Sequence, residues 1–125
     1  MDKQRPSEIV QAFLDYLEAC KNEYEVAYAD VGEEDKRVQD FLHAMEFAPT
    51  RKERNKIATQ LHNSRVARRI AKDKSQELEK IYKFYKDPAN VPMLKKLRNL
   101  VKEQKRTEEY LESERHYKPR VGDVE

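Results

Sequence analysis

Apolar residues recur at alternating steps of three and four through the first fifty positions of the chain. This spacing keeps one side of an α-helix against a partner helix, and it predicts one continuous helix over residues 7–48. Gly32 falls inside the series, and two helices that meet there are the alternative, although one glycine costs a helix only about 1 kcal/mol relative to alanine. Only Glu34 interrupts the apolar series, which consists of Val10, Phe13, Leu17, Cys20, Tyr24, Ala27, Val31, Val38, Phe41, Met45 and Ala48.

Prolines divide the rest of the chain into two further helices. Pro49 disfavours helical backbone at the residue before it, and a second helix is expected over residues 51–87. Pro88 separates that helix from a third, over residues 91–117, which leaves a tail at 118–125. The expected N-caps of the three helices are Ser7, Thr50 and Asn90.

Short connections favour antiparallel neighbours, so the sequence predicts an all-α fold, an elongated antiparallel three-helix hairpin with coiled-coil-like seams, in a single domain over residues 1–125. In that arrangement the second helix places Ser64, Arg68 and Ser75 on its seam, and the arginines near Arg68 lie level with the acidic run at 30–35. The third helix would bring Glu108, Glu109 and Glu112 near residues 67–71. Apolar side chains beyond the seam predict a homodimer; they are Ile9, Leu14, Tyr28, Leu42 and Phe47.

Composition supports narrow helical seams rather than a thick core. Charged residues make up 40% of the 125 residues and hydrophobic residues 38%. The seven tyrosines and four phenylalanines fall largely on helical spacing, which argues against a disordered chain. The apolar runs are only a few residues long, so no membrane partner is expected and the predicted location is cytoplasmic.

The net charge of +2 conceals a division along the chain. Residues 1–48 carry 12 acidic and 5 basic side chains, whereas residues 49–125 carry 12 acidic and 21 basic ones. Two basic surfaces follow as candidate binding sites for nucleic acid or for an acidic protein. For the first, internal ion pairing with the acidic residues is the expected role and ligand binding is the alternative; for the second, a solvated helix face is the alternative. The first, the basic belt, is Arg65, Arg68, Arg69 and Lys72; the second, the basic stripe, is Lys95, Arg98, Lys102, Lys105 and Arg106.

The residues that usually carry chemistry do not form a pattern. His43, His62 and His116 lack the spacing of a zinc site, and Cys20 lies on the apolar seam. A chain with two glycines offers no glycine-rich loop for a phosphate. We therefore expect no catalytic residue, metal site or cofactor, and a protein that is not an enzyme.

Three stretches of the chain carry a resemblance to known proteins: 28–43 (YADVGEEDKRVQDFLH), 61–69 (LHNSRVARR) with Lys72-Asp73, and 109–111 (EYL) with 115–120 (RHYKPR). They resemble a group of small, uncharacterised proteins encoded by phages and prophages of Gram-positive bacteria. The resemblance implies a phage protein that acts by binding a host, phage or defence component in the cytoplasm of an infected or lysogenic bacterium. An inhibitor of a host defence nuclease, of the anti-CRISPR kind, is one concrete form, and a nucleic-acid-binding accessory protein is the alternative.

Overall fold

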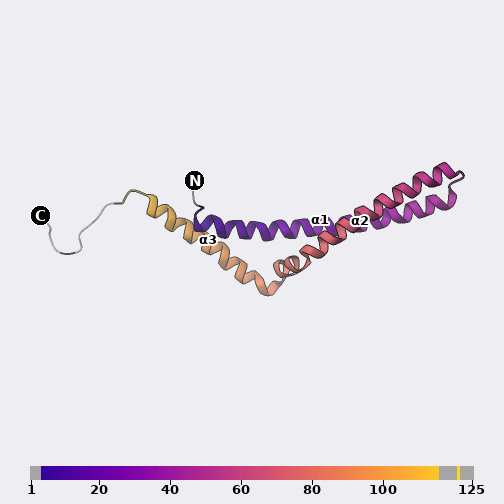
Figure 1. The fold of residues 1–125 in the computed structure, drawn as a ribbon. Helices are drawn as coiled ribbons and strands as arrows, with labels where there is room; N and C mark the ends of the chain where they lie inside the picture. The colour runs from indigo at the N-terminus through magenta and orange to yellow at the C-terminus, as the bar shows by residue number, and fades with distance from the viewer. Residues whose placement is uncertain (1–3, 116–120, 122–125) are drawn as a thin grey trace.

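Three α-helices and one short 3-10 turn form the chain in a computed structural model, which describes residues 4–115 and residue 121. The helices are α1 (Pro6–Phe47), α2 (Arg51–Lys86) and α3 (Val91–Glu112), and the turn is η1 (Pro88–Asn90). Within the described residues there is no strand, and Figure 1 shows an elongated molecule built on the long α1. The predicted all-α helical hairpin is confirmed.

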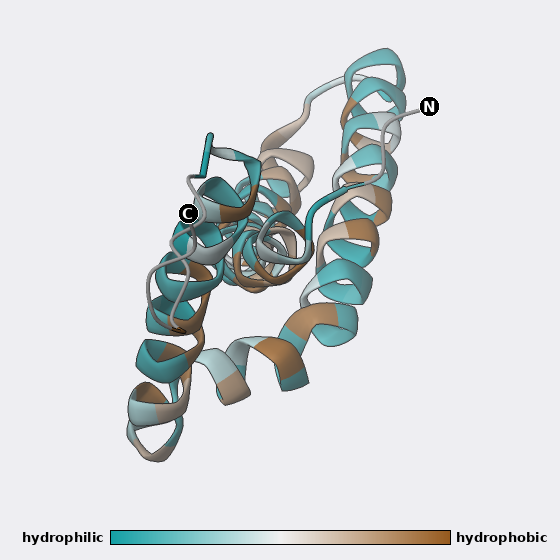
Figure 2. Ribbon diagram, turned by 90° about the vertical axis from the view of Figure 1, so that its left-hand side faces the viewer, coloured by the Kyte–Doolittle hydropathy of each residue, from teal (hydrophilic) through white to brown (hydrophobic). Residues whose placement is uncertain are grey.

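Helix α1 is continuous over its 42 residues, as the apolar series predicts, and the two-helix alternative is wrong. Gly32 lies inside the helix on its exposed side, where a Cβ atom would meet nothing within 4 Å. The buried and half-buried positions repeat every three or four residues from Ser7 to Ala48. Hydrophobic residues therefore appear only at intervals along the helices, as the brown segments among the teal ones show (Figure 2).

Helix α2 packs antiparallel along the second part of α1. Thr50 caps it as predicted, because its Oγ1 accepts a hydrogen bond from the amide of Glu53 at 3.2 Å. The register places Ser64 opposite Glu34 and brings the Lys74 Nζ to 3.9 Å from a carboxylate oxygen of Glu23. The seam positions of α2, including Ser64 and Ser75, are those that the sequence predicts.

Helix α3 departs from the prediction, because it packs against α1 instead of folding back along α2. The turn η1 bends the chain without reversing it, so α2 and α3 follow one another along α1 and form the V in Figure 1. Hydrogen bonds hold the bend: the Asp87 carboxylate accepts from the amide of Ala89, and the Asn90 side-chain amide donates to the carbonyl of Phe84. Asn90 is thus the N-cap residue of α3 by position only, since its side chain makes no capping bond.

The N-terminal part of α1 buries a different set of residues from the predicted one, because α3 packs there together with Ile81 and Tyr85 at the end of α2. Leu14 and Leu17 form the core cluster with Leu94 and Val101 of α3. Leu14, expected outside the seam, is only 6% exposed, while Phe13, expected on it, is 52% exposed. A partner on another side of the helix moves the seam by one residue, which the apolar pattern alone does not reveal.

Both ends of the α1–α3 pair also differ from the expected boundaries. Arg5, not Ser7, is the N-cap residue of α1, and Ser7 is buried against α3. Helix α3 ends at Glu112 and not at residue 117, because the backbone of Ser113 is extended and its hydroxyl bonds the carbonyl of Tyr110. Residues 116 and 117, like most of the expected tail, lie outside the described part of the chain.

One polar layer interrupts the apolar seam between α1 and α2. Glu34 and Ser64 are both buried, and the Ser64 hydroxyl donates a 2.6 Å hydrogen bond to the Glu34 carboxylate. The second carboxylate oxygen of Glu34 pairs with Arg37 on the same helix. The interruption at Glu34 that the sequence shows is therefore a satisfied polar contact between the two helices.

Replacing Gly32 by alanine should stabilise the protein by about 0.5–1 kcal/mol, because alanine loses less backbone entropy in a helix and the added methyl group meets no neighbour. Urea unfolding followed by circular dichroism measures the change. The control is Ala29→Gly at a nearby exposed helical position, which should destabilise by a similar amount. A destabilised Gly32→Ala variant would contradict a regular helix at this position.

Replacing Ser64 by valine should destabilise the hairpin by about 1–3 kcal/mol, because it removes a donor from a buried carboxylate. Adding Glu34→Leu to Ser64→Val should recover most of that loss, since an apolar pair can replace a buried polar one. Ser75→Ala is the control and should cost less, because the Ser75 hydroxyl bonds only the carbonyl of Lys72 on its own helix. Additive effects in the double variant would show that the two residues are not coupled.

Candidate functional site

Among the described residues, one of the four cationic side chains of the basic belt on α2 forms an ion pair with an acidic residue. Arg68 Nε lies 2.5 Å from Oδ1 of Asp35, and the two side chains are 36% and 55% exposed. Arg65, Arg69 and Lys72 are exposed and make no ion pair with the rest of the described residues. The predicted internal pairing is thus correct for Arg68 alone. An ion pair this exposed contributes about 1 kcal/mol or less.

The other acidic residues expected beside the belt have different partners. Glu34 bonds Ser64 and Arg37, and Glu33 lies 3.6 Å from Lys36 on its own helix. The contact predicted between Glu108 and the belt is wrong, because α3 carries Glu108 to the opposite end of α1. Most of the charge of the belt is therefore available to a ligand.

A stack of three tyrosines lies beside the belt, and the sequence analysis did not identify it. The ring centroids of Tyr24 and Tyr82 are 4.2 Å apart, and those of Tyr24 and Tyr28 are 6.1 Å apart. Tyr28 is 68% exposed and lines a shallow depression together with Arg68 and Lys72. The spacing of Tyr24 and Tyr28 by four residues is the signal in the sequence, but the position of Tyr82 requires the register of α2.

The basic stripe lies on α3 and does not join the belt. All five of its residues are exposed, and none forms an ion pair within the described part of the chain. Lys105 lines a depression at the level of Ser7, whereas the belt lies near Asp35, far along α1. The two predicted surfaces are therefore separate sites.

Acidic side chains of α1 lie next to the stripe. In an antiparallel pair, residues that directly follow seam positions on both helices lie on the same flank. Glu8 and Asp15 follow the seam of α1 in this way, and they line the same depression as Lys105. The flank between α1 and α3 is therefore acidic along one helix and basic along the other.

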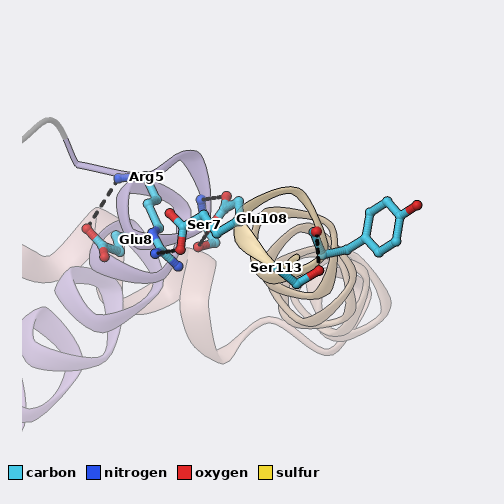
Figure 3. Close-up of polar contacts among 7 residues, drawn as sticks. Arg5, Ser7, Glu8, Glu108 and Ser113 are labelled. Carbon is cyan, nitrogen blue, oxygen red and sulfur yellow. Dashed lines mark hydrogen bonds and ion pairs between the residues drawn. The ribbon is translucent and has the colours of Figure 1, made fainter. Parts of the chain in front are cut away.

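Glu108 fixes the position of the stripe, because it joins α3 to the first turn of α1 (Figure 3). Its carboxylate accepts hydrogen bonds from the Ser7 hydroxyl at 2.5 Å, the Ser7 amide at 3.0 Å and the Gln104 side chain at 3.1 Å. Desolvation raises the pKa of Glu108, but these hydrogen bonds outweigh it and leave the pKa below its usual value. Arg5 adds an ion pair to Glu112 at the same end.

An apolar groove of about 610 Å³ opens between α1 and α2 on the flank opposite the belt. Its floor is Ala27, Ala67 and Ala71, and its walls are Val26 and Ile70, which are 62% and 65% exposed. The small side chains leave the space, and Glu23, Asp30 and Lys74 line its edges. This groove was not predicted from the sequence, because alanines at helical spacing also fit an ordinary helix contact.

The described residues hold no cluster of three or more histidine, cysteine or acidic side chains that could bind a metal ion. None of the helices described carries an apolar stretch of the length that crossing a bilayer requires. The arrangement offers exposed charge, an aromatic stack and one apolar groove, which are means of binding.

The stability that Glu108 contributes should be lost in acid. Because its pKa is lowered in the folded state, the contribution is complete above the unfolded value of about 4.5 and disappears as the pH falls through the folded value. Glu108→Gln should therefore be less stable than the parent at pH 7, with the difference closing toward pH 3, in urea unfolding followed by circular dichroism. Glu109→Gln is the exposed control and should match the parent throughout. A pH-independent difference would assign Glu108 another role.

Comparisons of the chain with protein-family models, with curated proteins and with solved structures give no match, so the assignment of function depends on the surfaces described above.

Proposed function

We propose that this protein acts by binding another protein, without catalysis, and that the flank between α1 and α3 is the contact surface. The observation that carries the proposal is the position of the exposed basic stripe beside the acidic residues of α1. A protein partner can place opposite charges against both rows. Complementary charge patterns of this kind give specificity and fast association.

Nucleic acid fits this flank less well. A phosphate backbone carries only negative charge, and Glu8 and Asp15 would repel it beside the lysines that attract it. The stripe also has only one neighbouring aromatic residue of its helix, Tyr110, which faces Arg115 at 5.5 Å. A single-strand binding groove usually adds several aromatic rings on which bases can stack.

The belt favours nucleic acid as the second candidate. Arg68 and Lys72 of the belt line the same depression as Tyr24 and Tyr28, and Tyr28 exposes most of its side chain. Cationic side chains beside an exposed aromatic ring are the combination that binds single strands. Asp35 and Glu79 lie in the same region and reduce the positive field there.

The resemblance to phage and prophage proteins suggests a narrower form of the proposal. In that form the partner is a host defence complex, and the protein inhibits its nuclease as anti-CRISPR proteins do, in the cytoplasm of an infected or lysogenic bacterium. A small charged helical protein that binds without catalysis suits this role.

The test uses Lys102→Glu/Lys105→Glu as the variant and Lys52→Glu/Lys56→Glu, at the exposed start of α2, as the control. The tagged parent and control should recover the same specific protein from an infected or lysogenic host, and the stripe variant should recover at least tenfold less. Recovery of no specific protein by the parent would contradict the proposal.

The binding of fluorescently labelled single-stranded and duplex DNA distinguishes the second candidate function, nucleic-acid binding by the belt, from the first. We expect weak binding that is the same for the parent and the stripe variant at about 0.15 M salt. Tight binding with a steep salt dependence, lost in Arg65→Glu/Arg69→Glu or in Tyr28→Ala, would instead assign the belt to nucleic acid.

A further inference from the structure

A second apolar surface lies on α1, on the flank opposite Glu8 and Asp15. Ile9, Phe13 and Tyr16 follow one another at steps of four and three, and their side chains are 54%, 52% and 59% exposed. The exposed Ala19 lies between Tyr16 and Val26. From Ile9 to Val26 this surface is about 26 Å long, at 1.5 Å per residue. We call it the α1 ridge.

The α1 ridge ends in the apolar groove. Val26 is both the last large residue of the ridge and one wall of the groove. The surface is therefore convex at one end, where Ile9 and Phe13 project, and concave at the other, where Ala27, Ala67 and Ala71 leave space. A convex end and a concave end of similar chemistry on one face can fit each other in a pair of molecules.

We propose that the α1 ridge binds a second copy of this chain, with the two α1 helices antiparallel and Ile9 of each copy in the apolar groove of the other. A two-fold axis requires a surface that is complementary to itself. Reversing α1 about a point between Leu17 and Glu18 pairs residues whose numbers sum to 35. This reversal places Ile9 against Val26.

Two further pairs in this register are compatible, while Phe13 comes level with Asn22 at the edge of the groove. Tyr16 meets Ala19, so a large side chain faces a small one on both sides of the axis. Arg5 comes level with Asp30 on the acidic edge of the groove, and its side chain is 37% exposed beside Glu112. Shifting the register by one heptad would instead place Ile9 against Ala19 or Glu33, which removes the contact between Ile9 and Val26 at both ends.

This surface is separate from the flank between α1 and α3 that carries the proposed function. The acidic residues Glu8 and Asp15 of that flank follow the seam of α1, whereas Ile9 and Phe13 directly precede seam residues. A dimer would thus expose two copies of the partner-binding flank. Loss of the dimer and loss of partner binding can be measured independently.

Light scattering on a concentration series up to about 0.1 mM, well above micromolar dissociation constants, tests the dimer. We expect twice the mass of the 125-residue chain for the parent and for Phe47→Asp, an exposed site on the same helix outside the ridge. Phe13→Asp and Val26→Asp should each weaken the dimer at least tenfold while keeping the helical circular dichroism of the parent. A monomeric parent, or a dimer that both ridge substitutions leave intact, overturns the proposal.

Disulfide crosslinking tests the orientation. In a Cys20→Ala background, Ile9→Cys and Val26→Cys variants should crosslink with each other when they are mixed and oxidised. Either variant alone should give little crosslinking, because equivalent positions lie far apart in an antiparallel pair. Crosslinking of Ile9→Cys with itself would show a parallel arrangement and overturn the assigned register. A monomeric parent that still recovers its protein partner would leave the proposed function standing without the dimer.

Discussion

The structure depends on one constraint: a charged chain with few apolar residues can bury them only in narrow seams, and a single 42-residue helix provides the surface for all of these seams. Helix α1 is about 63 Å long, at 1.5 Å per residue. Neither α2 nor α3 buries its seam without it, since each packs mainly against α1. The length of α1 therefore determines the shape of the molecule.

The polar layer sets the register of this assembly. Glu34 and Ser64 are opposite each other in the middle of the α1–α2 seam. A shift by one heptad would place the Glu34 carboxylate against Ala71 or Ile57, neither of which can donate a hydrogen bond. The layer adds little to stability compared with an apolar pair, but it excludes these alternative registers.

The two ends of α1 support different surfaces. Where α2 covers it, the hairpin has the basic belt and the tyrosine stack on one flank and the apolar groove on the other. Where α3 covers it, one flank carries rows of opposite charge, and the α1 ridge continues toward the groove on another side. Surfaces of distinct chemistry are thus separated on a molecule that has little interior.

The sequence by itself determined the helices, the continuity of α1 through Gly32 and the register of α2 on α1, because the heptad spacing, the prolines and the Thr50 cap are local signals. It also identified both basic surfaces. Only the tertiary structure decided the path of α3, since a bend and a reversal at Pro88 have similar local sequences. That path moved Glu108 from the belt to Ser7 and exchanged Phe13 for Leu14 in the core. The groove and the tyrosine stack likewise depend on which faces of two helices meet, and a periodicity measured along one helix does not contain that information.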